Sequence, residues 1–188
     1  VPLAAIKAAL IPETKLIWLT DPFNPTGTKL DPDQLHQFCR EVPSSVVIVI
    51  DEAYMEFSDG DTLGNSRKLV EAFDNVILLR TFSKFYRLAS LRIGYAVAQP
   101  ALIQMILPYR IPPNHNRLGV AAAVASLTDN QSQQETLHFM KREKSHLTQA
   151  LMDLGFKVIP SHANFLFISL EGHPNAMIDK LAEQVIFK

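Results

Sequence analysis

The chain has 188 residues, of which 47% are hydrophobic, so it can bury the core of one domain or somewhat more. Its 18 basic and 19 acidic residues leave a net charge of −1 with no long run of either sign, which argues against nucleic acid or an anionic membrane as partner. No apolar run reaches membrane-spanning length and the first residues lack a signal-peptide pattern, which favours the cytoplasm. The single cysteine, Cys39, excludes an intramolecular disulfide, and its helical surroundings predict a buried structural thiol.

The first part of the chain alternates between predicted helices and strands. We expect a helix over residues 3–10, a strand over 15–20, and a helix that Asp31 caps, with Pro32 at its first position, running to about residue 40. Between the last two lies Asp21-Pro-Phe-Asn-Pro-Thr-Gly27, a rigid loop in which prolines fix φ and Gly27 permits a positive φ. Taken alone it is an ordinary strand-to-helix turn, but it follows a strand's carboxyl end, where open α/β sheets bind ligands.

The middle of the chain predicts the centre of a sheet. Residues 46–50 are five consecutive β-branched residues, which indicates a strand buried on both faces. Asp51-Glu-Ala-Tyr54 follows directly, and a helix over 63–73 leads to a buried parallel strand over 75–79 and another strand over 93–98. This alternation predicts an α/β fold whose mainly parallel sheet has helices on both faces.

The last part predicts a smaller α/β unit. Expected there are helices over 100–107, 134–154 and 174–184, an alanine-rich stretch over 116–128, and strands over 156–160 and 164–169, with Gly155 ending the long helix. We therefore divide the chain into residues 1–115 and residues 116–188. The six histidines lack the spacing of metal ligands, and the pair His138 and His146 is typical of a solvated helix face, so no metal is expected.

The residues best suited to bind a ligand or react lie in the stretch from Thr81 to Tyr95. Thr81, Ser83 and Arg92 offer two hydroxyl donors and a forked cation, which is what a phosphate monoester needs. Lys84 lies among them, and an amine held beside a bound phosphate suggests a covalent imine with a phosphorylated aldehyde, of which pyridoxal phosphate is the common one.

Four short motifs resemble, in order and spacing, the signatures of fold-type I pyridoxal-phosphate aminotransferases. They are Asn24-Pro-Thr-Gly27, Asp51-Glu-Ala-Tyr54, Ser83-Lys84 and Arg92-Ile-Gly94. The histidinol-phosphate aminotransferase branch is the most similar, and Ser161-His-Ala-Asn-Phe165 resembles a strand of its small domain. The resemblance implies that residues 1–115 are part of the large cofactor-binding domain, and that residues 116–188 are a linker helix and part of the small C-terminal domain.

The resemblance also implies a role for each matched residue. Lys84 would form the Schiff base and act as general acid–base, and Asp51 would pair with the pyridine nitrogen. Asn24 and Tyr54 would hydrogen-bond the phenolate oxygen of the ring and tune the imine, and the phosphate would be held by Thr81, Ser83 and Arg92. The implied reaction transfers an amino group from a histidinol phosphate-like or aromatic substrate to 2-oxoglutarate, in a biosynthetic homodimer.

This sequence departs from the family pattern just after the lysine. Phe85 stands where small residues are usual, and Arg87 and Ser90 occupy positions often held by a small residue or glycine. We interpret the bulk beside Lys84 as a change on the substrate side. Threonine-phosphate decarboxylases also tend to carry an aromatic residue there, so a decarboxylase on the same cofactor stays an alternative.

Other family features have no match in this sequence. The glycine-containing phosphate loop, the ring-stacking residue and the aromatic from the partner subunit would lie upstream of Val1, and the carboxylate-binding arginine beyond Lys188. We therefore expect the chain to be a fragment that is inactive by itself. A truncated, non-catalytic remnant is another alternative, and a plain ligand-binding doubly wound domain is a weaker one because it would not need Lys84.

Overall fold

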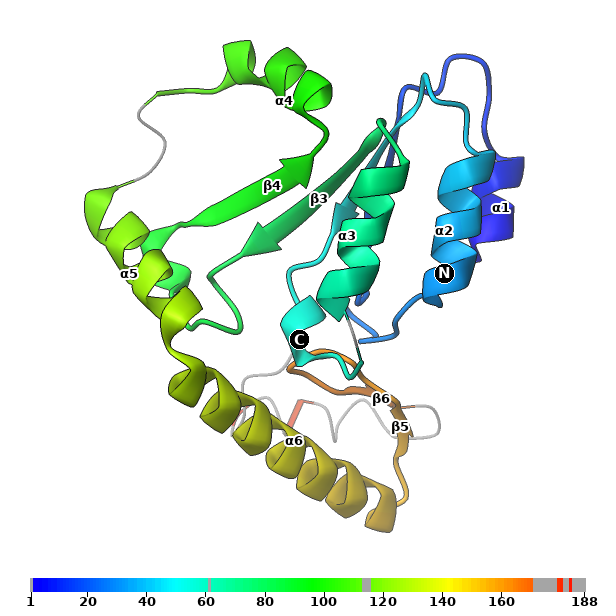
Figure 1. Cartoon of the computed structure of the whole chain (residues 1–188). Helices are drawn as coiled ribbons and strands as arrows, with labels where there is room; N and C mark the ends of the chain where they lie inside the picture. Colours follow the sequence, from blue (N-terminus) through cyan, green and yellow to red (C-terminus); the bar gives the residue numbers. More distant parts are fainter. Residues whose placement is uncertain (1, 61, 113–115, 171–178, 181–182, 184–188) are drawn as a thin grey trace.

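The computed structural model describes residues 2–60, 62–112, 116–170, 179, 180 and 183. Within them a four-stranded sheet and a two-stranded sheet are joined by long helices (Figure 1). The elements are, in chain order, α1 (Leu3–Ala8), β1 (Leu16–Thr20), α2 (Pro32–Glu41), β2 (Val47–Asp51), η1 (Met55–Phe57), α3 (Thr62–Ala72), β3 (Val76–Thr81), η2 (Ala89–Leu91), β4 (Gly94–Ala98), α4 (Pro100–Ile106), η3 (Leu107–Tyr109), α5 (Arg117–Thr128), α6 (Asn130–Asp153), β5 (Lys157–Ile159) and β6 (Phe167–Ser169).

The larger sheet has the strand order β1-β2-β3-β4. The pairs β1–β2 and β2–β3 are parallel, and β4 runs antiparallel to β3. The four strands expected here are therefore confirmed, with bounds that differ by one or two residues, whereas β6 of the smaller sheet begins three residues later than expected. The prediction of a mainly parallel sheet is confirmed as well.

Helices cover the two faces of this sheet unequally. On one face α1, α2 and α3 enclose the main core, where Ile48, Ile50 and Val76 are completely buried. On the other face Leu102 of α4 packs against Val49 and Ile77. Side chains alternate along a strand, so Leu16 and Trp18 of β1 point to this second face, where they are 52% and 56% exposed. Helices on both faces are as expected, but the described helices leave the β1 side of the second face open.

The helix ends follow from local chemistry. Asp31 caps α2 by accepting hydrogen bonds from the backbone N–H groups of Asp33 and Gln34, as the sequence predicts. The long helix α6 begins at Asn130 rather than at residue 134, because Asp129 caps it by accepting the N–H of Ser132 at 2.9 Å. The end of α6 lies just before Gly155, whose φ is +87°. The helix expected over 174–184 falls almost wholly outside the described residues.

Cys39 lies on the buried side of α2, and burial raises the pKa of its thiol to about 12. A thiol this far from ionisation is a poor nucleophile, which confirms the prediction of a structural cysteine. In the part of the chain that the structure describes, no helix combines the length and apolar character needed to cross a membrane.

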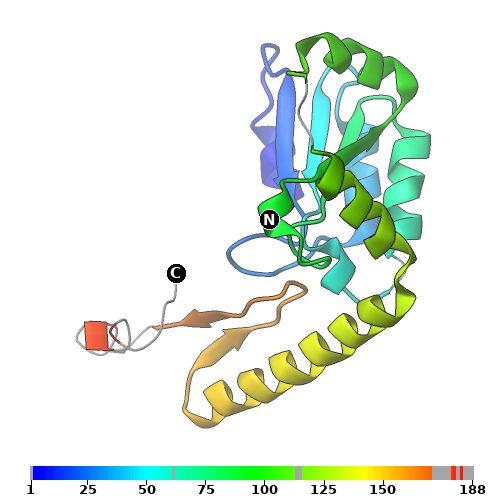
Figure 2. The ribbon, with the colours of Figure 1, turned by 90° about the vertical axis from the view of Figure 1, so that its left-hand side faces the viewer.

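The two-stranded sheet pairs β5 with β6 in antiparallel register, and α6 runs alongside it (Figure 2). Residues 161–165, between these strands, reach back to the loop that follows β1. The N–H of His162 donates to the carbonyl oxygen of Gly27 at 2.7 Å. From α6, Lys144 Nζ donates to the carbonyl oxygens of Ser161 at 2.7 Å and Ala163 at 3.1 Å. The turn is thus held on one side by the long helix and on the other by the first loop of the large sheet.

This contact makes Gly27 sensitive to substitution. Its φ is +73°, as the sequence predicts, and a Cβ there would lie 2.1 Å from Ser161 Oγ. Gly155 has a similar φ of +87°, but a Cβ there would meet nothing within 4 Å. We expect Gly27→Ala to lower the free energy of unfolding by about 1–3 kcal/mol more than Gly155→Ala, because both lose glycine's freedom but only the first also creates a clash. Urea unfolding of the two variants measures the difference, and equal losses would contradict this packing.

Candidate cofactor site

The carboxyl ends of the three parallel strands bring three chain segments to one edge of the sheet. Thr20 is in register with Asp51, and Asp51 with Leu79. The ladder continues one residue further, with the N–H of Asp21 donating to the carbonyl oxygen of Asp51 and the N–H of Glu52 to that of Leu79, each at 2.9 Å. The segments that follow, residues 21–30, 51–57 and 81–92, therefore start side by side.

Asn24, Tyr54 and Lys84 form the first group of site residues. Asn24 Nδ2 donates to the Tyr54 hydroxyl oxygen at 3.1 Å, and Lys84 Nζ lies 5.5 Å from the centroid of the Tyr54 ring. Tyr54 is only 8% exposed, and Phe165 packs edge-on against it with ring centroids 5.1 Å apart. Asn24 and Lys84 are exposed. A fixed phenol thus joins an amide and an accessible primary amine that come from three different loops.

Thr81, Ser83 and Arg92 form a second group. The N–H of Ser83 donates to Thr81 Oγ1 at 3.0 Å, and Arg92 Nη1 lies 3.4 Å from Ser83 Oγ. Arg92 has a φ of +53° and also donates to the carbonyl oxygen of Ala89 at 2.9 Å, which anchors its side chain across the loop. Two hydroxyls and a guanidinium that lie near one another are a suitable donor set for a phosphate group.

Asp51 makes its hydrogen bond with neither group. Its Oδ1 accepts the N–H of Ala53 at 3.1 Å, which fixes the carboxylate at the end of β2. The side chain is partly exposed. Because the strand alternates, Asp51 points to the sheet face opposite the main core, on the same side as Val49 and Thr81.

The residues after Lys84 lie differently from the expectation. Phe85 is buried, with its ring edge-on to that of Phe57 at 5.5 Å between centroids. It therefore fills a space against η1 and does not add bulk to the surface around Lys84. Arg87 has a φ of +59°, a conformation that glycine adopts without strain, and its Nη2 donates to Ser132 Oγ at 3.0 Å. The positive φ explains why a glycine is suited to this position.

Behind the site lies a buried charged cluster that the sequence did not lead us to expect. Arg80 contacts Glu52, Glu56 and Ser66 on the face covered by α3. Burial raises the pKa of both glutamates, an effect that the guanidinium of Arg80 opposes. The signal in the sequence was Arg80 itself, a charged residue inside the otherwise apolar run of β3.

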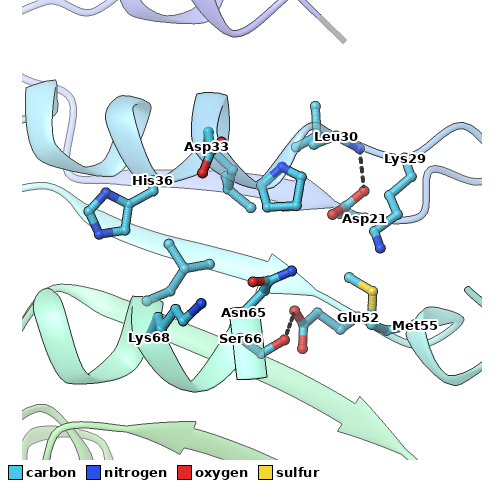
Figure 3. Close-up of a pocket in the computed structure, with 13 residues that line it drawn as sticks. Asp21, Lys29, Leu30, Asp33, His36, Glu52, Met55, Asn65, Ser66 and Lys68 are labelled. Carbon is cyan, nitrogen blue, oxygen red and sulfur yellow. Dashed lines mark hydrogen bonds between the residues drawn. The ribbon is translucent and has the colours of Figure 1, made fainter. Parts of the chain in front are cut away.

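Asp21 is a second buried acid at this edge. Its Oδ1 accepts the N–H of Leu30 at 2.8 Å, and this bond ties together the two ends of the loop that carries Asn24. Asp21 and Glu52 line one small cavity of about 90 Å³ between α2 and α3, on the helix-covered face. Figure 3 shows both side chains there. Burial raises the pKa of Asp21 to about 6, although the Leu30 hydrogen bond and nearby Lys29 both act to lower it.

This pKa predicts how stability varies with pH. Between the ordinary aspartate value of 3.8 and about 6 the folded state holds a proton that the unfolded state has lost. The free energy of unfolding therefore falls as pH rises through this window, by up to about 3 kcal/mol from Asp21. Asp21→Asn should remove this contribution, because its amide oxygen can still accept from Leu30 without ionising.

Urea unfolding at several pH values between 4 and 7 measures that slope. The surface variant Asp74→Asn serves as the control and should leave the slope in place. An unchanged slope in Asp21→Asn would show that Asp21 does not carry the buried proton.

Comparisons with known proteins identify relatives that are similar to most of this chain. Histidinol-phosphate aminotransferase 2 of Ralstonia nicotianae is 42% identical over 166 residues, which are 88% of this chain and 44% of that protein. The aromatic amino acid aminotransferase of Mycolicibacterium paratuberculosis is 39% identical over 180 residues, 96% of this chain and 51% of that protein. The chain thus spans about half the length of these relatives.

Solved structures of two enzymes are also similar to this chain. The crystal structure of histidinol-phosphate aminotransferase from Sinorhizobium meliloti in complex with pyridoxal-5'-phosphate matches with a TM-score of 0.86 and 31% identity, over 98% of this chain and 50% of that one. L-threonine-O-3-phosphate decarboxylase from Porphyromonas gingivalis matches with a TM-score of 0.79 over 95% of this chain and 55% of that one. Its identity of 24% means that this second likeness concerns the fold alone.

A family model spans almost the whole chain. The model for aminotransferase class I and II matches residues 2–187, a range that contains both sheets and every residue of the two site groups. With the relatives and the fold in agreement, the chain belongs to the class I and II aminotransferase family.

Proposed function

We propose that the protein containing this chain is a pyridoxal-phosphate-dependent aminotransferase. The observation that carries the proposal is the placement of Lys84 beside the Asn24–Tyr54 pair and one residue from the Thr81, Ser83 and Arg92 cluster. An accessible amine, a phenol paired with an amide, and an anion-binding cluster occupy one edge of a parallel sheet, where ligands bind.

The residues present fit this cofactor group by group. Thr81, Ser83 and Arg92 are all donors and suit a phosphate dianion. The Asn24 amide already donates to the Tyr54 hydroxyl, so the pair can share a ring oxygen. The carboxylate of Asp51, on the same face as Thr81, suits a protonated ring nitrogen.

When bound, pyridoxal phosphate supplies an aldehyde that combines with amines and a ring that accepts an electron pair. We infer that Lys84 Nζ would hold the cofactor through its aldehyde and, when free, could take up and return a proton as a general acid–base. The negative charge of Asp51 would favour the protonated form of the ring nitrogen and so strengthen the ring as an electron acceptor. Lys84 Nζ lies over the Tyr54 ring, which would hold the amine close to the phenol.

The proposed amino donors are histidinol phosphate-like or aromatic compounds, with 2-oxoglutarate as acceptor. This substrate class is supported by the names of the relatives, which include both histidinol-phosphate and aromatic amino acid aminotransferases. A biosynthetic role, a cytoplasmic location and a homodimeric assembly complete the proposal. So does the division into a cofactor-binding part, residues 1–115, and a linker with part of a small domain, residues 116–188.

A decarboxylase on the same cofactor is the second candidate, because an aromatic residue, Phe85, follows the lysine. Its burial against Phe57 means that it does not shape the surface around Lys84, which weakens this candidate. A substrate amino acid labelled in its carboxyl group separates the two. Transamination leaves the label in an oxo acid, whereas decarboxylation releases it as CO2.

Lys84 is predicted to be the residue that binds the cofactor covalently. Reduction of the cofactor-loaded protein with borohydride, followed by peptide mapping, should place the pyridoxyl label on Lys84. Lys84→Arg keeps a positive charge but should take no label. A label on Lys29 or Lys15 would contradict the assignment, and no label on the wild-type protein would favour a non-catalytic remnant.

Asp51→Asn is predicted to keep the fold and to slow proton abstraction. The amide is similar in size and can still accept the N–H of Ala53, but it lacks the charge that stabilises a protonated ring nitrogen. We expect kcat to fall on the order of 100-fold or more, which corresponds to several kcal/mol of transition-state stabilisation. Steady-state kinetics measure the change, with Asp74→Asn as a surface control. Turnover near the wild-type rate would refute this role.

A further inference from the structure

Arg80 links three elements behind the candidate site. Its Nε lies 2.6 Å from Glu52 Oε2, its Nη1 lies 3.2 Å from Glu56 Oε1, and its Nη2 donates to Ser66 Oγ at 3.1 Å. Ser66 in turn donates to Glu52 Oε1 at 2.6 Å, a bond drawn in Figure 3. One guanidinium in β3 thus joins the end of β2, η1 and α3.

These partners are direct neighbours of the proposed cofactor residues. Arg80 precedes Thr81, and Glu52 follows Asp51. Because side chains alternate along a strand, Thr81 and Asp51 face the site, whereas Arg80 and Glu52 face the cluster. Glu56 lies on η1, whose first turn is closed by the bond from the N–H of Phe57 to the carbonyl oxygen of Tyr54. The cluster therefore connects the two segments that carry Asp51, Tyr54, Thr81 and Lys84, on the side opposite the proposed cofactor site.

Stability alone does not explain such a cluster. Two carboxylates share one buried cation, and Glu56 Oε2 is buried without a hydrogen-bond partner among the described atoms. Burying charges costs several kcal/mol per ion, and well-packed apolar side chains often serve stability equally well. Apolar side chains, however, would not fix the relative orientation of these segments. The forked guanidinium does so, because it binds two carboxylates and a hydroxyl at set angles.

We propose that Arg80 is a positioning residue that, through Glu52 and Glu56, fixes the spacing between the segment 51–54 and the segment 81–84. The inference rests on the proposed function. Thr81 and Lys84 contribute to the phosphate and aldehyde ends of the cofactor, whereas Asp51 and Tyr54 contribute to its ring. A shift of about 1 Å between the segments can cost ~100-fold in rate, so their separation matters to the site as a whole.

Two pairs of variants test the inference in the cofactor-loaded protein. Arg80→Lys keeps the charge but not the fork, and its matched control is Arg67→Lys, which alters the exposed Arg67–Glu71 ion pair on α3. Glu56→Ala removes the contact with Arg80, whereas Glu56→Gln keeps an oxygen that can accept from Nη1 and removes only the charge. The readouts are the dissociation constant of pyridoxal phosphate, the pH midpoint of its absorbance change, and kcat and KM.

Arg80→Lys and Glu56→Ala should weaken cofactor binding by about tenfold or more, shift the absorbance midpoint, and lower kcat more than they raise KM. Arg67→Lys should stay within about threefold of wild type because its ion pair is exposed. Glu56→Gln should lose clearly less than Glu56→Ala because it keeps an acceptor for Arg80 Nη1. The inference is overturned if Arg80→Lys and Glu56→Ala lower only the melting temperature, or if Glu56→Gln behaves like Glu56→Ala. The variants are compared with wild-type protein in which borohydride reduction has first been shown to label Lys84. Failure of that labelling would overturn the proposed function as well, whereas unaffected variants of a labelled protein overturn this inference alone.

Discussion

The shared register of β1, β2 and β3 is the constraint on which the site depends. Parallel strands cannot be joined by a tight hairpin, so α2 and α3 carry the chain back across one face and leave the carboxyl ends free to bear loops. The ladder extends past the strands through Asp21 and Glu52, so the first residue of each following segment is still held by backbone hydrogen bonds. Loop residues as distant in sequence as Asn24 and Lys84 therefore leave from adjacent, fixed points.

Alternation along these strand ends separates two kinds of side chain. Asp51 and Thr81 point to the face on which the cofactor is proposed to bind. Asp21, Glu52 and Arg80 point to the opposite, helix-covered face, where they are buried. Glu52 faces both Asp21, across the small cavity, and Arg80, through their ion pair. Besides burial, repulsion between the carboxylates of Glu52 and Asp21 raises the pKa of Asp21. The buried residues Asp21, Glu52 and Arg80 are therefore electrostatically coupled from β1 to β3.

Sequence reasoning predicted well the features that depend on neighbouring residues. The cap of α2 at Asp31, the positive φ of Gly27 and the full burial of Ile48 and Ile50 each follow from local chemistry or composition. The partners of Arg80 could not be found this way, because Glu52 lies 28 residues away and only the register of β2 with β3 brings it near. A single charged residue in a strand does not reveal whether it faces solvent, a ligand or another charge. The motifs similarly indicated which residues belong to the site, but not that Phe85 turns away from it.

Tyr54 shows that the site belongs to both sheets. Its hydroxyl accepts from Asn24, its ring faces Lys84 Nζ, and the same ring packs nearly perpendicular to Phe165 in the segment between β5 and β6. That segment is fixed in turn by Lys144 of α6 and by the carbonyl oxygen of Gly27. Because Gly27 lies in the same loop as Asn24, two routes from the β5–β6 segment converge on Tyr54, one through the loop and one through Phe165. The packing of α6 and its hairpin therefore contributes to the orientation of the phenol, together with the strand that precedes it.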